Sequence, residues 1–150
     1  MPKASVTWNG DLKLVGRDQF GHEVLMEAHK RYGGSGEGTT PMDLFLIALG
    51  GCASLDIITM LKSRNQDLAS LDVELEGIRR EEHPRFFSKI SIKFKLKGTL
   101  DDNIVERVVR LTMTKLCPIA AMLANISELK WSYEISKGAQ LEQPIKTQQS

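Results

Sequence analysis

The pattern of hydrophobic and polar residues predicts strands at the start of the chain. Alternating residues are separated by two turn-forming segments, Asn9-Gly10 and Phe20-Gly21-His22, and this arrangement is typical of a β-meander. We expect its three strands over residues 3–8, 12–15 and 23–26.

A glycine-dense segment, residues 32–39, follows the meander. It lacks the Gly-Lys-Ser/Thr ending of a phosphate-binding P-loop and the glycine spacing of a dinucleotide-binding turn, so a phosphate site is not expected. We expect a flexible surface loop here, with a lid over a site as the alternative.

A continuous apolar run over residues 44–61 predicts one long helix that ends near Ser63. Thr40 can serve as its N-cap, Pro41 suits the first helical position and Asp43 completes a capping box. The helix is apolar on nearly every side, which is typical of the central helix of a core.

The same run does not favour a membrane span. It contains Asp56, two adjacent glycines and a cysteine. A charged residue within a bilayer is costly, and the uninterrupted apolar part is too short to cross one. We therefore expect no membrane partner, and we expect a second copy of the chain to cover the apolar faces that one small domain leaves open.

Alternation returns over residues 72–80 and 86–96, which predicts a hairpin. The second of these strands is strongly amphipathic. Its apolar face carries Ile90, Ile92, Phe94 and Leu96, and its polar face carries Lys89, Ser91, Lys93 and Lys95.

The last third of the chain predicts two helices and a strand. Residues 101–103 cap a helix whose apolar stripe includes Ile104, Val105, Val108 and Leu111. Pro118 opens a second, short helix that ends near Asn125, and residues 130–135 read as the closing strand.

The predicted order is thus βββ–α–ββ–αα–β. Strands and helices are segregated rather than alternating, which indicates an α+β fold with a largely antiparallel sheet and a long central helix. The chain has 150 residues, enough for one domain with a substantial core. We expect that single domain over residues 1–137 and a disordered tail over residues 138–150.

Composition narrows the class of function. Charged residues make up 26% of the chain and hydrophobic residues 41%, but the net charge is only +1, so nothing electrostatic favours a nucleic-acid partner. The first residues contain no apolar segment suited to a signal peptide. A cytoplasmic protein is expected, in which thiols stay reduced unless they are catalytic or sensing.

Two cysteines, Cys52 and Cys117, are the candidate reactive groups. Each alone is most simply an inert core thiol. Cys117 precedes Pro118 and is the expected N-cap of the short helix, whose dipole favours a thiolate. Cys52 lies in the middle of the long helix, with Asp56 one turn along on the same face. Local physics therefore predicts that Cys117 is the more acidic thiol.

No metal or cofactor is expected. The two cysteines are 65 positions apart and no histidine lies near either one, which does not fit a zinc-binding pattern. We expect Asp56 to be a buried hydrogen-bond acceptor or a dimer contact.

Several segments of the chain, taken together, resemble the OsmC/Ohr family, the osmotically inducible and organic hydroperoxide resistance proteins. Within that family they resemble the YhfA-like branch. The resemblance covers roughly residues 3 to 136. It is carried by Gly33-Gly34 to Thr40-Pro41, by the Asp43–Asp56 helix with Gly50-Gly51-Cys52, by Arg79-Arg80-Glu81-Glu82, by Lys115-Leu116-Cys117-Pro118 and by Tyr133-Glu134-Ile135.

The resemblance implies an intertwined homodimer that reduces hydrophobic organic hydroperoxides with its thiols. Cys52 would attack the peroxide and become a sulfenic acid, and Cys117 would resolve it to a disulfide that a dithiol reductant reopens.

Family peroxidases also use an arginine and a glutamate, whose positions fall on Leu12 and Met42 here. Arg17, Arg79, Asp43 and Asp56 are the candidate supporting residues. We therefore expect weak peroxidase activity. The alternative is a non-enzymatic dimer that binds an apolar small molecule or senses oxidants.

Overall fold

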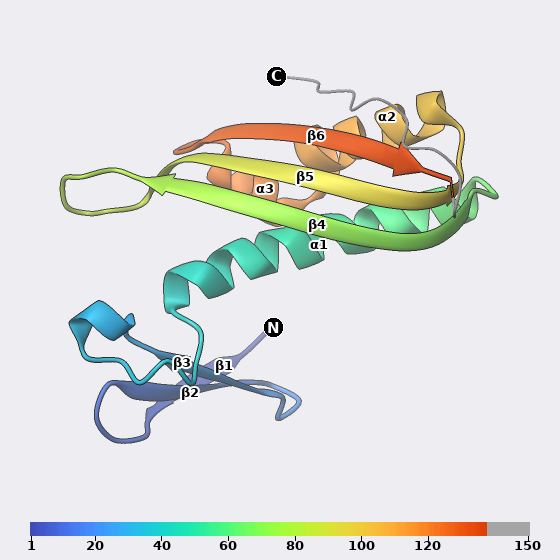
Figure 1. Ribbon diagram of the computed structural model, residues 1–150. Coiled ribbons are helices and arrows are strands. Elements are labelled where there is room, and N and C mark those ends of the chain that lie inside the picture. The colour runs from blue at the N-terminus through green and yellow to red at the C-terminus, as the bar shows by residue number, and fades with distance from the viewer. Residues whose placement is uncertain (138–150) are drawn as a thin grey trace. The chain divides into compact units, whose positions relative to one another are not determined.

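The computed structural model describes residues 1–137 and consists of two compact units, residues 1–45 and the residues from 46 onward (Figure 1). The expected tail over residues 138–150 lies outside the described residues. The single domain expected over residues 1–137 stays a prediction.

The first unit contains the predicted meander. Its strands are β1 (Ala4–Trp8), β2 (Lys13–Asp18) and β3 (Glu23–Glu27), paired antiparallel in the order β1-β2-β3. Gly10 has a φ of 83° in the first turn, a conformation that glycine adopts without strain.

The glycine-dense segment folds around a buried carboxylate, which the sequence did not predict. Glu27, only 2% exposed, accepts hydrogen bonds from the backbone N–H of Gly38 at 2.7 Å and from the N–H and hydroxyl of Ser35 at 2.7 and 2.9 Å. The Gly38 N–H, followed by the Ser35 groups, lowers the pKa of Glu27 from 4.5 to about 2, since donors stabilise the charged form. The loop is therefore organised by Glu27.

Helix α1 spans Pro41–Ser63 and begins as predicted. The Thr40 hydroxyl accepts the Asp43 N–H at 3.1 Å and donates to the Asp43 carboxylate at 2.7 Å. By length and mean hydropathy alone the helix could cross a membrane. One stripe along it is nevertheless buried within the chain, formed by Leu49, Ala53, Ile57 and Leu61.

Within one chain, α1 is buried along one side only, although it is apolar on nearly every side. The opposite face remains open, with Ile47 59% and Leu55 69% exposed. On the buried side, a Cβ at Gly50 would lie 2.8 Å from Leu75 Cδ1, so the missing side chain lets α1 approach β4 closely.

The second sheet has the order β4-β5-β6, with β4 at Asp67–Arg79, β5 at Phe87–Thr99 and β6 at Glu128–Ser136. β4 and β5 form the predicted antiparallel hairpin, although β4 begins five residues earlier than residue 72. The predicted apolar face of β5 is buried: Ile90, Ile92, Phe94 and Leu96 are at most 3% exposed.

Strand pairing is largely antiparallel, as predicted. The exception is β6, which runs parallel to β5. The connection between them passes through the helices α2 (Asp102–Leu111) and α3 (Pro118–Leu123). A crossover of that length returns the chain in the same direction, as in other parallel pairs.

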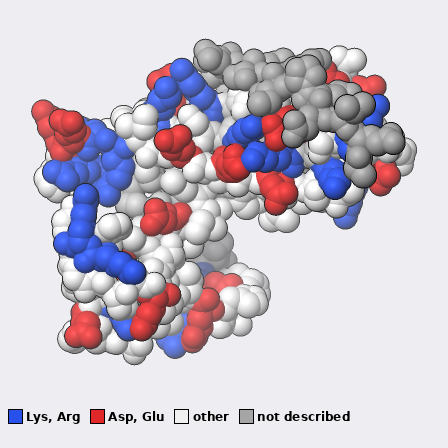
Figure 2. Space-filling model, viewed as in Figure 1, with Lys and Arg blue, Asp and Glu red and all other residues white. Residues whose placement is uncertain are grey.

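The polar face of this sheet is lined with ion pairs. Lys93 pairs with Glu134 at 2.8 Å, Lys130 pairs with Glu128 at 3.1 Å, and Lys95 pairs with Glu74. Figure 2 shows Lys and Arg side chains interspersed with Asp and Glu on the face that it presents.

Candidate functional site

Helix α1 presents two polar side chains beside its buried stripe. Cys52 and Asp56 are four residues apart, so they lie on the same side of the helix, and both are half-buried. Their neighbours Ala53 and Ile57 are fully buried, which fixes the orientation of this side of α1 in the second unit.

Cys117 lies where the backbone changes from one helix to the next. The π-helical segment Thr112–Leu116 ends there, and the Cys117 N–H donates to the Thr112 carbonyl at 3.0 Å. Cys117 is the N-cap of α3, as predicted, and its Sγ accepts the Ala120 N–H at 3.4 Å. Its side chain is only 1% exposed.

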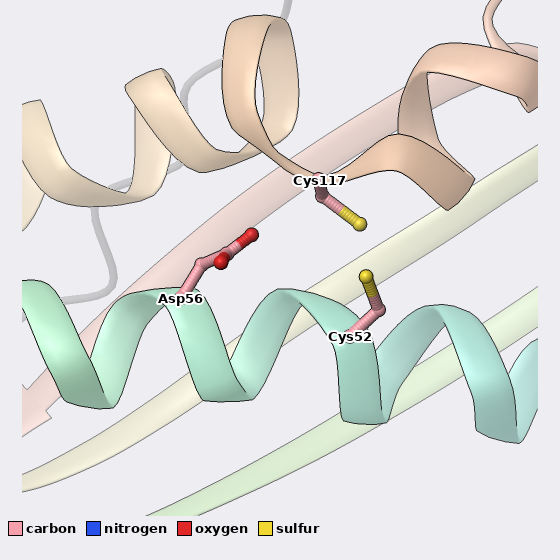
Figure 3. A group of neighbouring side chains, drawn as sticks. All are labelled: Cys52, Asp56 and Cys117. Atoms are coloured by element: carbon pink, nitrogen blue, oxygen red, sulfur yellow. The ribbon is translucent and has the colours of Figure 1, made fainter. Parts of the chain in front are cut away.

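The fold brings these three side chains together. Cys52 Sγ, Cys117 Sγ and an Asp56 carboxylate oxygen all lie within 4.8 Å of one another. Figure 3 shows Cys52 and Asp56 projecting from α1 toward Cys117 on the facing segment. Both cysteines are free thiols, and the expected proximity of the pair is confirmed.

The prediction that Cys117 is an acidic thiol is wrong. Burial raises the pKa of its thiol from 9.0 to about 11, against the N–H of Ala120, which lowers it. The N–H group at the helix terminus lowers the pKa of the thiol, as expected. The removal of the thiolate from water raises the pKa by more. Cys117 is therefore a protonated thiol at neutral pH.

Asp56 has an incompletely paired carboxylate. Its Oδ2 is buried and has no hydrogen-bond partner among the described residues. The role expected for Asp56 as a hydrogen-bond acceptor is thus not filled at this oxygen. Leaving a carboxylate oxygen buried and unpaired is costly.

The other candidate supporting residues are held by local partners. Arg17 pairs with Glu23 at 2.5 Å, Asp43 is engaged by Thr40, and Arg79 donates to the Arg85 carbonyl at 2.6 Å. Arg17 and Asp43 belong to the first unit.

Sequence reasoning considered each member of the cluster but missed the cluster itself. It set aside a metal site because the cysteines are far apart in sequence. The usable signal was the four-residue spacing of Cys52 and Asp56, which puts two potential ligand atoms on one helical face. The third ligand atom comes from tertiary structure.

The chain belongs to the OsmC-like protein family, whose sequence pattern matches residues 34–132. Protein YhfA of Escherichia coli strain K12 is 36% identical over 135 residues, which cover 89% of this chain and 97% of the relative.

Solved structures of other proteins share the fold. A hypothetical protein of Aquifex aeolicus VF5 has a TM-score of 0.82 at 26% identity, covering 91% of this chain and 97% of the other. A Legionella pneumophila protein described as the organic hydroperoxide resistance protein OsmC has a TM-score of 0.67 at 18% identity, covering 89% and 96%. The likeness to the Legionella protein shows the fold alone.

Proposed function

We propose that this protein is a cysteine-based peroxidase that reduces hydrophobic organic hydroperoxides through Cys52 and Cys117. The observation that carries the proposal is the pair of free thiols, whose sulfurs lie within 4.8 Å of each other. Family membership supports it, and so does the description of the Legionella relative as a hydroperoxide resistance protein.

The different exposure of the two sulfurs supports the roles that the family resemblance implies for them. Cys52, the half-buried thiol, attacks the outer peroxide oxygen as a thiolate; the O–O bond breaks, the alcohol leaves with a proton and Cys52 becomes a sulfenic acid. The Cys117 sulfur then displaces the hydroxyl, which leaves as water, and a disulfide forms. A dithiol reductant supplies two electrons and two protons to restore both thiols.

The pKa of Cys117 suits the resolving role. A resolving thiol has to stay unreacted until the sulfenic acid appears, and a buried thiol with a raised pKa reacts slowly with peroxide itself. Burial of Cys117 thus separates the roles of two nearby cysteines.

Mass spectrometry after one equivalent of cumene hydroperoxide tests this proposal. The wild type is expected to lose both thiols together as an internal Cys52–Cys117 disulfide, with a mass two hydrogens lower. Cys117→Ser is expected to stop at a sulfenic acid that a dimedone probe traps on Cys52. Persistence of both thiols in the wild type would rule out the peroxidase.

A non-enzymatic binder or oxidant sensor is the second candidate, and it is favoured by Leu12 and Met42. These residues occupy the positions at which the family resemblance implies an arginine and a glutamate. An arginine stabilises both the thiolate and the charge that develops on the leaving oxygen, and loss of such a donor costs about 10²–10³-fold in rate.

Turnover assays with a dithiol reductant separate the two candidates. For a peroxidase that lacks its activating pair, Leu12→Arg with Met42→Glu should raise the rate by about 10²-fold, and adding Cys52→Ser should abolish the gain. Equal and negligible turnover in wild type and double variant would favour the binder or sensor.

We also propose that the protein is a homodimer. The open face of α1 carries the exposed apolar side chains Ile47 and Leu55 with the small residues Ala48 and Gly51. An apolar helix face of this length is typically covered by another protein surface, and a two-fold partner supplies the same face in return.

A further inference from the structure

The Cys52, Asp56 and Cys117 cluster offers a set of donors that the thiol reaction does not need in full. Disulfide chemistry requires the two sulfurs, whereas the third ligand atom is a carboxylate oxygen within 4.8 Å of both. Two sulfurs and one oxygen, held on two facing segments, match the donor types that zinc and related thiophilic cations take from proteins.

The unpaired oxygen of Asp56 is an independent indication of a ligand. Asp56 Oδ2 is buried without a hydrogen-bond partner among residues 1–137, and Figure 3 shows the carboxylate lying on the side of α1 that faces Cys117. A cation at this position would compensate the buried oxygen directly.

The spacing of the donors fits a single ion. Zinc binds sulfur at about 2.3 Å and carboxylate oxygen at about 2.0–2.2 Å, so two donors on one tetrahedral ion lie about 3.5–3.8 Å apart. The three atoms already lie within 4.8 Å, so they have to approach by only about 1 Å. Cys52 and Asp56 are half-buried, which leaves their side chains room to rotate.

We propose that the reduced protein binds one thiophilic divalent cation, Zn²⁺ in the first place, through Cys52 Sγ, Cys117 Sγ and a carboxylate oxygen of Asp56. Two sulfur–zinc bonds and one oxygen–zinc bond form, both thiol protons pass to solvent, and no electron is transferred. Three protein ligands leave the fourth position of a tetrahedral ion open.

The proposed cation site shares both sulfurs with the peroxide reaction, but cation binding itself requires only the reduced thiols and no peroxide. It does compete with that reaction, because a sulfur in a disulfide has no thiolate to offer. Bound cation would therefore protect the pair from oxidation, and disulfide formation would release the cation.

Cobalt titration of the reduced, untagged protein tests the proposal without any peroxide. One equivalent of Co²⁺ is expected to produce a thiolate-to-cobalt charge-transfer band in the near ultraviolet, which one equivalent of Zn²⁺ then removes. The same equivalent of Zn²⁺ should protect both cysteines of the wild type from maleimide, a readout that needs no variant.

Variants assign the ligands. Cys52→Ser and Cys117→Ser should each remove about half of the band, and Asp56→Asn should keep both thiolate contributions while weakening affinity at least about 10–100-fold. Asp72→Asn is the matched control, because Asp72 is an exposed carboxylate on β4, and it should bind as the wild type does. Circular dichroism confirms that each variant is folded.

Two results would overturn the proposal. A wild type without a charge-transfer band and without protection of its thiols has no such site. A folded Asp56→Asn variant with wild-type affinity would show that the carboxylate is not a ligand, and the three-donor assignment would fail. Either result leaves the peroxidase proposal untouched, because the latter depends on disulfide formation alone.

Discussion

At the scale of single residues, burial affects the pKa of the Cys117 thiol more strongly than its position at a helix terminus does. Cys117 has the N-cap position and the N–H hydrogen bond that lower a thiol pKa elsewhere. Its almost complete burial nevertheless raises the pKa to about 11. The sequence contains the helix signal in Pro118, but burial depends on side chains distant in the chain.

The reactivity of Cys117 should therefore increase steadily with pH. A pKa of about 11 in place of 9.0 leaves about a hundredfold less thiolate at neutral pH. In Cys52→Ser, where Cys117 is the remaining cysteine, the rate of iodoacetamide labelling should rise about tenfold with each pH unit between about pH 8 and pH 10. A short denatured peptide with the same sequence provides the reference. A labelling rate that levels off by about pH 10, as the rate of the peptide does, would contradict the raised pKa.

At the scale of elements, one close contact between a glycine and an aromatic ring constrains the β4–β5 hairpin. A Cβ at Gly77 on β4 would lie 2.5 Å from the Cδ1 atom of Phe87 at the start of β5. Phe87 is 5% exposed, so its ring cannot move aside freely. The hairpin therefore requires a residue without a side chain at position 77.

Gly77→Ala should lower the free energy of unfolding by about 1–3 kcal/mol, as overpacking does elsewhere. The measurement is urea denaturation followed by circular dichroism. Because the cost comes from the ring, it should shrink when Gly77→Ala is made in a Phe87→Leu background. An equal cost in both backgrounds would place the strain in the backbone instead.

Elements with one buried face were predictable from the sequence, and relations between elements were not. The alternation around Ile92 and Phe94 marks β5, and Thr40, Pro41 and Asp43 mark the start of α1, because these signals are local. The direction of β6 depends on how the chain crosses over after β5. The meeting of Cys117 with α1 likewise depends on packing across the second unit.

At the scale of the whole molecule, one face of α1 is more apolar than a solvent-exposed helix normally is. Leu55 is 69% and Ile47 59% exposed within one chain. The opposite side of the helix is buried to 0% at Leu49 and Ile57. The helix thus has two apolar sides, and the chain itself covers one of them.

Leu55→Glu should convert the proposed dimer to monomers. In a two-fold dimer each subunit would bury one new glutamate in the interface. We expect the dissociation constant to rise about a hundredfold or more, measured by sedimentation equilibrium. Ile78→Glu is the matched control, since Ile78 is 54% exposed on β4 and should leave the dimer intact. A wild type that sediments as a monomer at micromolar concentration would refute the dimer.

The parallel pairing of β6 with β5 has a consequence for synthesis on the ribosome. The hairpin of β4 and β5 can close early, but the other edge of β5 has no strand beside it until Glu128–Ser136 has emerged. A hydrophobic strand with an open edge invites pairing between nascent chains. Lysines at positions 89, 93, 95 and 97 alternate with the apolar residues of β5, and such charges discourage that pairing. The lysine row therefore protects the unfinished sheet before the ion pair of Lys93 with Glu134 on β6 exists.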